Sequence, residues 1–120
     1  MFRYVNQNPK GKSVGDCTVR AISTAAGISW DKAYCELCAA GYSMADMPDA
    51  NAVWGAVLRR HLIPESCPDC YTVEKFCEDH PSGVYVLALR AHVVAVVNGN
   101  YMDTWNSGEE CPLYFWTKED

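Results

Sequence analysis

The spacing of hydrophobic and polar positions changes at about residue 80. Before that point, apolar residues recur every three or four positions, as on one face of a helix. After it, short β-branched and aromatic runs are separated by turn residues, which is typical of strands. This order predicts an α+β domain, in which N-terminal helices pack on a C-terminal antiparallel sheet.

The first predicted helix covers about 16–26. Gly15 or Asp16 supplies its N-terminal cap, and Gly27 is a typical helix stop. This placement puts Cys17 in the first turn of the helix, where backbone N–H groups have no partner within the helix.

Three further helices are expected before the sheet. One begins after Ser29 and stops at Gly41. The next spans about 50–62 and is ended by Pro64, and a short helix covers 72–80.

The chain is expected to form one domain over 1–120. Residues 1–15 are polar and rich in turn formers, so we expect an irregular N-terminal segment there. Residues 16–80 are then mainly helical, and residues 83–117 form the antiparallel sheet. The expected strands are 84–90, 92–98, 100–105 and 112–116.

One predicted hairpin brings two chemically useful side chains together. Asn98 and Gly99 are a strong signal for a two-residue turn. The pairing that follows makes His92 and Asp103 diagonal neighbours on one face, about 7–8 Å apart at the backbone, which their side chains can bridge. A three-residue loop would instead place Asn106 on the face of His92. The turn chemistry favours Asp103.

Cys17 is the candidate nucleophile. The unpaired N–H groups and the positive end of the helix dipole favour its thiolate. The neighbouring carboxylate of Asp16 opposes that effect, so a basic partner is needed. His92 is the candidate base, and Asp103 would orient its imidazole, which completes the set that covalent acyl transfer needs.

Two motifs resemble a known family. The G-D-C-T-V-R-A-I start and the H-V-V-A-V-V-N-G-N-Y-M-D-T-W stretch are similar to those of the papain-like cysteine peptidase superfamily. The closest likeness is to small bacterial and phage-encoded members. The resemblance covers most of the chain and is most specific at 14–27 and 80–106. It implies a papain-like fold with Cys17 as nucleophile, His92 as base and Asp103 as the third member of a triad.

The resemblance also implies an oxyanion hole formed by the N–H of the cysteine and an upstream Gln or Asn. The position six residues before Cys17 is Gly11, which departs from the family pattern. Asn8 is the predicted oxyanion residue if the loop doubles back, and Asn6 and Gln7 are the alternatives.

Two side chains near the predicted site are candidates for a substrate groove. Arg20 lies one turn after Cys17 and could contact a substrate carboxylate or pair with Asp16. Trp105 is predicted to lie on the face of Asp103, where it would line the groove or pack in the core.

The cysteine spacing raises the question of zinc. Two C-x-x-C pairs, Cys35/Cys38 and Cys67/Cys70, have the spacing of a four-thiolate site. The first pair lies within a predicted helix, where packing explains Cys38 without a metal. A variant set is Cys67, Cys70, Cys77 and His80, although the last two also suit a helix end. We predict no metal site and no cofactor.

Composition narrows the class of protein. The 120 residues are 49% hydrophobic and 21% charged, which is ordinary for a globular domain. A net charge of −5 opposes binding to nucleic acid or to an anionic membrane surface. The sequence shows no signal peptide or membrane span, and seven cysteines is an odd count. These features predict a cytoplasmic protein with free thiols.

Together the features favour an enzyme, a cysteine hydrolase of the peptidase, amidase or isopeptidase type. It would act through a thioester on a peptide or protein substrate, or on an amide-bearing small molecule. Acyl transfer to an amine would use the same residues. The alternative is a non-catalytic binding module on a papain-like scaffold, phage-encoded and acting on a host protein.

Overall fold

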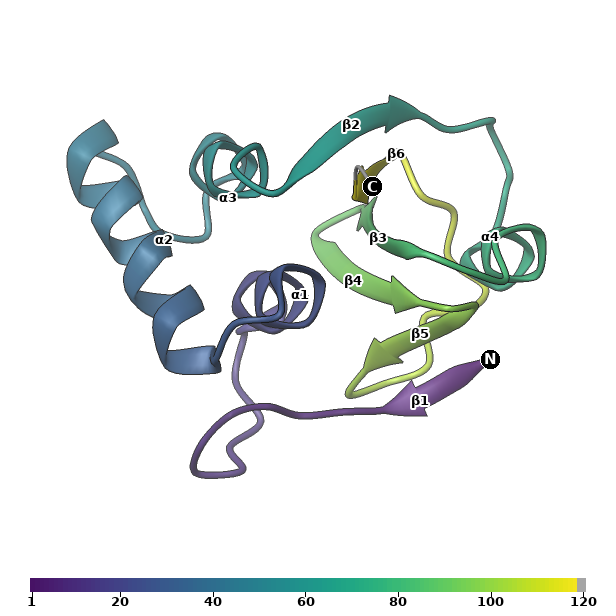
Figure 1. The fold of residues 1–120 in the computed structure, drawn as a ribbon, viewed down its shortest axis with the longest axis horizontal. Helices are drawn as coiled ribbons and strands as arrows, with labels where there is room; N and C mark the ends of the chain where they lie inside the picture. The colour runs from purple at the N-terminus through teal and green to yellow at the C-terminus, as the bar shows by residue number, and fades with distance from the viewer. Residues whose placement is uncertain (119–120) are drawn as a thin grey trace.

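The computed structural model describes residues 1–118 and has an α+β fold, so the predicted fold class is confirmed (Figure 1). The described residues form four helices and one six-stranded sheet. In chain order they are β1 (Phe2–Tyr4), α1 (Cys17–Ala26), α2 (Trp30–Met44), α3 (Asn51–Leu58), β2 (Leu62–Ser66), α4 (Val73–Asp79), β3 (Val84–Leu89), β4 (His92–Val97), β5 (Asn100–Asp103) and β6 (Tyr114–Lys118).

The first two helices begin where the sequence predicts. Gly27 ends α1 in the left-handed conformation, with φ of 68°. Ser29 caps α2 by accepting a hydrogen bond from the backbone N–H of Lys32. The predicted stop at Gly41 is wrong, because α2 continues to Met44. A Cβ at position 41 would lie 2.8 Å from a backbone oxygen, so this glycine permits close packing of the following loop.

Two strands lie where the sequence analysis placed none. β1 forms within the segment expected to be irregular, and β2 interrupts the region expected to be helical. The third helix ends at Leu58 instead of 62. Pro64 lies inside β2, which is an edge strand of the sheet, where the missing N–H of proline is tolerated.

The strand order is β1-β5-β4-β3-β6-β2. The β1–β5 pair is parallel and the other pairs are antiparallel, so the sheet is mixed and not purely antiparallel as predicted. The hairpin register is confirmed: Val97 pairs with Asn100 and Ala95 with Met102 across the turn at Asn98 and Gly99. Both turn residues have positive φ, 49° and 78°, as a two-residue hairpin requires.

Two apolar clusters pack on the sheet. One joins α1, α2 and α3 to alternate residues of β3 and β4, including Val86, Ala88, Val93 and Ala95. The other joins α4 to the intervening residues of these strands and to Tyr101. Within residues 1–118, no helix has the length and apolar character needed to cross a bilayer.

Candidate active site

Cys17 is the first residue of α1 and is half-buried. The residue before it, Asp16, makes no side-chain capping bond to the helix. Its carboxylate accepts instead from Arg20 Nε at 2.9 Å and from Trp30 Nε1 at 3.0 Å. The positive helix end is therefore left without a side-chain cap where the Cys17 thiol lies, and the nearby carboxylate is neutralised by an arginine.

His92 is the first residue of β4 and carries the ring that faces both partners. Its Nε2–H donates to Asp103 Oδ2 at 2.6 Å, and the ring lies close enough to the Cys17 thiol for each group to shift the pKa of the other. The side chain is 11% exposed. The indole of Trp105 lies 4.7 Å from the imidazole, centroid to centroid, and covers it. The ring therefore lies among the Asp103 carboxylate, the Cys17 thiol and the Trp105 indole.

Asp103 is the last residue of β5 and is fully buried. Its Oδ1 accepts from the backbone N–H of Thr104 at 2.8 Å and from Arg20 Nη1 at 3.1 Å, while Ser107 Oγ donates to Oδ2 at 3.3 Å. Burial alone would raise the pKa of this carboxyl. The hydrogen bonds from His92, Thr104 and Arg20 outweigh it and lower the pKa, so Asp103 is a carboxylate.

The thiol and the imidazole shift each other in opposite directions. Burial would raise the pKa of Cys17, but hydrogen bonds from His92 and from the backbone N–H of Val93 lower it overall. Burial would lower the pKa of His92, but its bonds to Asp103 and Cys17 raise that pKa to about 9. Together these shifts favour a Cys17 thiolate beside a His92 imidazolium at neutral pH.

A hollow of about 470 Å³ opens at the pair formed by Cys17 and His92. Asp49 and Asn51 line it from the helical side, and Arg90 lines it from the β3–β4 turn. Substrate atoms placed in this hollow would reach both the sulfur and the ring.

Asn51 is a candidate that the sequence analysis missed. It is the first residue of α3, and its Oδ1 accepts from Trp54 Nε1 at 3.0 Å. Because the oxygen is taken, the –NH₂ group is the free end of this side chain, in a hollow where a neutral donor is useful. The Asn-x-x-Trp spacing is the signal in the sequence that could have indicated this contact.

The predicted oxyanion residues lie elsewhere. Gln7 Nε2 donates to the backbone oxygen of Arg20 and to Thr24 Oγ1. Asn6 Nδ2 donates to the Lys12 carbonyl, and Asn8 Oδ1 accepts from backbone N–H groups of its own loop. None of the three lines the hollow at Cys17, and Asn8 borders a separate one.

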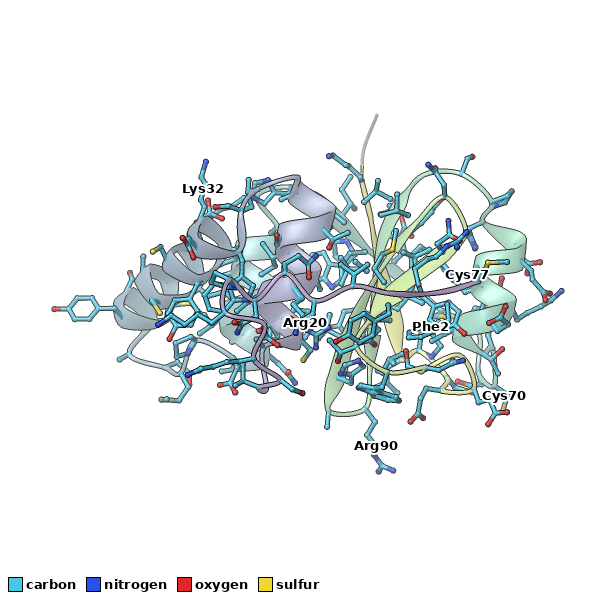
Figure 2. All side chains as sticks on the ribbon, turned by 90° about the horizontal axis from the view of Figure 1, so that it is seen from below. Phe2, Arg20, Lys32, Cys70, Cys77 and Arg90 are labelled. Atoms are coloured by element: carbon cyan, nitrogen blue, oxygen red, sulfur yellow. The ribbon has the colours of Figure 1, made fainter. Side chains whose placement is uncertain are left out.

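The two groove candidates also have other positions than expected. Arg20 is only 6% exposed and lies between the helices and the sheet, so it is not a groove residue (Figure 2). Its predicted pairing with Asp16 is confirmed. Trp105 is 45% exposed, but it packs over His92 and does not line the hollow. By contrast, Arg90 projects from the edge of the molecule in Figure 2.

The structure does not bring the C-x-x-C pairs together. Cys35 and Cys38 lie on α2, whereas Cys67 and Cys70 follow β2 at the other end of the molecule (Figure 1). Across the described residues 1–118, no group of three or more His, Cys, Asp or Glu side chains is placed to hold a metal ion. All seven cysteines are free thiols.

The site thus holds the Cys17 thiol, the His92 ring and the buried Asp103 carboxylate in that order beside an open hollow. Such an order activates a thiolate for attack on an electrophilic carbon. Comparisons of the chain with known family models, with curated proteins and with solved structures found no match. The geometry at Cys17 therefore carries the functional proposal.

Proposed function

We propose that this protein is a cysteine hydrolase that cleaves an amide, peptide or isopeptide bond through a thioester on Cys17. The observation that carries the proposal is that the His92 ring is hydrogen-bonded to the buried Asp103 carboxylate and borders the same hollow as the Cys17 thiol, whose pKa it lowers. The order of these groups and the opposed pKa shifts are those of a nucleophile with its general base.

The bond changes follow from these positions. The Cys17 thiolate attacks the carbonyl carbon, and the carbonyl oxygen becomes an oxyanion. His92 then gives its proton to the leaving nitrogen, the C–N bond breaks, and a thioester remains. Water attacks the thioester carbon while His92 takes its proton, the C–S bond breaks, and the carboxylic acid product and the Cys17 thiolate are released.

The oxyanion needs hydrogen-bond donors near Cys17. The N–H of Cys17 belongs to a helix start that has no side-chain cap, so it is one donor for this role. The –NH₂ of Asn51 in the same hollow is the second donor in our proposal and replaces Asn8.

We also propose a papain-like fold. A cysteine at the start of a helix, with His and Asp on neighbouring antiparallel strands, supports it. The strands β1 and β2 lie at the two edges of the sheet, and we interpret them as additions to the papain-like fold.

The proposed substrate is a peptide, a protein or an amide-bearing small molecule. The net charge of −5 argues against nucleic acid as a partner. Seven free thiols support a reducing location such as the cytoplasm.

A second candidate is a non-catalytic binding module on the same scaffold. It is favoured by the placement of Asn6, Gln7 and Asn8, whose amides are used within the N-terminal loop or on α1. Acyl transfer to an amine is a variant of the first candidate, because it differs only in what attacks the thioester.

Trapping with electrophilic peptide-like probes tests the proposal. Peptidyl vinyl sulfones, chloromethyl ketones and aldehydes are incubated with the folded protein, and intact mass is read. We expect one adduct, which Cys17→Ala removes and the matched control Cys67→Ala keeps. If all classes leave folded Cys17 unmodified while unfolded protein reacts, the enzyme proposal is wrong and the binding module replaces it.

A further inference from the structure

Arg20 joins two acidic side chains from distant parts of the chain. Its Nε donates to Asp16 Oδ1 at 2.9 Å, and its Nη1 donates to Asp103 Oδ1 at 3.1 Å. Asp16 precedes α1, and Asp103 ends β5, 83 positions from the arginine. The arginine side chain is 7% exposed, and the two carboxylates are as buried or more so. A planar guanidinium can serve two such partners at once, whereas a lysine ammonium is a compact point charge.

The contact to Asp16 extends to a third element. Trp30 Nε1, at the start of α2, donates to the second carboxylate oxygen of Asp16 at 3.0 Å. Both oxygens of Asp16 are therefore occupied, and Asp16 cannot turn back to cap α1. Asp16, which directly precedes Cys17, is thereby held by Arg20 from the same helix and by Trp30 from α2.

The contact to Asp103 leaves room for the imidazole. Arg20 and the Thr104 N–H use Oδ1, while His92 and Ser107 use Oδ2. Arg20 therefore does not compete with His92 for an oxygen. It restricts rotation of the carboxylate so that Oδ2 points at the ring.

We propose that Arg20 is a positioning residue of the candidate site: it fixes the Asp103 carboxylate for His92 and holds it in register with the helix start that carries Cys17. This inference rests on the proposed function for what the site does. It gives the arginine of the G-D-C-T-V-R-A-I motif a role distinct from a surface ion pair or a substrate contact. Arg20 contacts both Asp16, next to Cys17, and Asp103, which binds His92. Loss of these contacts should therefore disturb the site even where the protein still folds.

A double-mutant cycle tests whether Arg20 acts through Asp103. The rate of Cys17 alkylation by iodoacetamide at pH 7 is measured for Arg20→Gln, Asp103→Asn and the double variant. We expect each single change to slow alkylation about tenfold, and the double variant to stay within about twofold of Asp103→Asn alone. Arg59→Gln is the matched control, since Arg59 lies over the Trp116 ring, 5.4 Å from its centroid, and should not change the rate.

A spectroscopic measurement separates positioning from a merely structural role. His92 Nε2 lies 2.6 Å from Asp103 Oδ2, so the proton between them should give a downfield NMR resonance in protein with ¹⁵N-labelled histidine. We expect Arg20→Gln to shift or broaden this resonance as Asp103→Asn does, and Arg20→Lys to restore it only in part. If Arg20→Gln does not fold by circular dichroism, the same cycle and resonance are measured with Arg20→Lys and with Asp16→Asn.

Two results would overturn the proposal: single effects that multiply in the double variant, or an Arg20→Gln protein that labels like the parent and keeps the resonance. Failure of the proposed function is recognised separately. If His92→Ala labels as fast as the parent, the hydrolase proposal fails, while the resonance measured in Cys17→Ala protein still reports whether Arg20 orients Asp103.

Discussion

The chain holds two regions in which a cysteine and a histidine lie close in space or in sequence, and they differ in chemistry. Cys17 and His92 are far apart along the chain, yet the fold brings them to the same hollow, and the pKa of the thiol is lowered. Cys77 and His80 are three positions apart around α4, and burial raises the pKa of that thiol to about 11. Closeness in sequence therefore does not activate a thiol.

The partners of each imidazole explain the difference. His80 stacks on Phe76 with ring centroids 3.8 Å apart, and its Nδ1 lies 2.8 Å from the Phe76 carbonyl oxygen. The His80 ring therefore packs against a residue of its own helix through its flat face. His92 is held instead by a buried carboxylate from the next strand, which stabilises the imidazolium and so the neighbouring thiolate.

The largest expected effect is loss of activation at Cys17 when His92 is removed. In His92→Ala, burial still raises the pKa of Cys17, but the hydrogen bond and the charge of His92 that lower it are lost, so a smaller fraction of the thiol is thiolate at pH 7. We expect alkylation by limiting iodoacetamide to slow about 100-fold, read by peptide mass. The matched change His80→Ala should leave the Cys17 rate unchanged. If Cys17 were alkylated at the same rate in His92→Ala and His80→Ala, His92 would have no special effect on the thiol and the two regions would not differ.

The second effect concerns the carboxylate. Asp103→Asn keeps the shape but removes the charge that stabilises the His92 imidazolium, so we expect Cys17 alkylation at pH 7 to fall about tenfold. Asp79→Asn is the control from α4, where an exposed carboxylate accepts from Tyr71 without reaching a thiol–imidazole pair. A full parent rate in Asp103→Asn would mean that His92 needs no orienting partner.

Much of the His92–Asp103 contact could be predicted because hairpin parity is a local property. The two residues of an Asn-Gly turn set the register, and the register sets which side chains share a face. The start of α1 at Cys17 and its stop at Gly27 were likewise predictable from local signals.

The remaining features depend on contacts that no local pattern encodes. β1 is a strand of three residues, Phe2–Tyr4, which is too short for a strand period to be recognised, and it forms because β5 offers it an edge. The pairing of Arg20 with Asp16 is local and could be predicted, but its contact with Asp103 forms only through the packing of α1 on the sheet. Asn51 likewise reaches the hollow at Cys17 only through the tertiary position of α3.

The third effect is a pH dependence of stability. The pKa of His92 is about 9 in the folded protein and near 6.5 when unfolded, so its contribution is full below pH 6.5 and is lost as pH rises through 9. The test compares urea unfolding of Cys17→Ala with that of Cys17→Ala/His92→Gln, a background without the Cys17 thiol. In this background Asp103 still raises the pKa of His92 but Cys17 no longer does, so we expect the stability difference to shrink by only about 1 kcal/mol between pH 6 and 10. Cys77 titrates near pH 11 and is common to both proteins. A difference that is flat or grows with pH would contradict the proposed ion pair.

The smallest effect concerns how the two helices begin. Thr72 caps α4 by accepting from the Lys75 N–H at 3.1 Å, whereas α1 has no side-chain cap because Asp16 is bound elsewhere. Thr72→Ala should therefore lower the free energy of unfolding by about 0.5–1 kcal/mol, measured by urea denaturation. Cys17 alkylation should not change, because that cap serves only the stability of α4. Ser29→Ala, which removes the equivalent cap of α2, is the matched control and should cost a similar amount. If Thr72→Ala also slowed Cys17 alkylation by more than about twofold, the α4 region would be coupled to the site, and the separation of the two regions would be wrong.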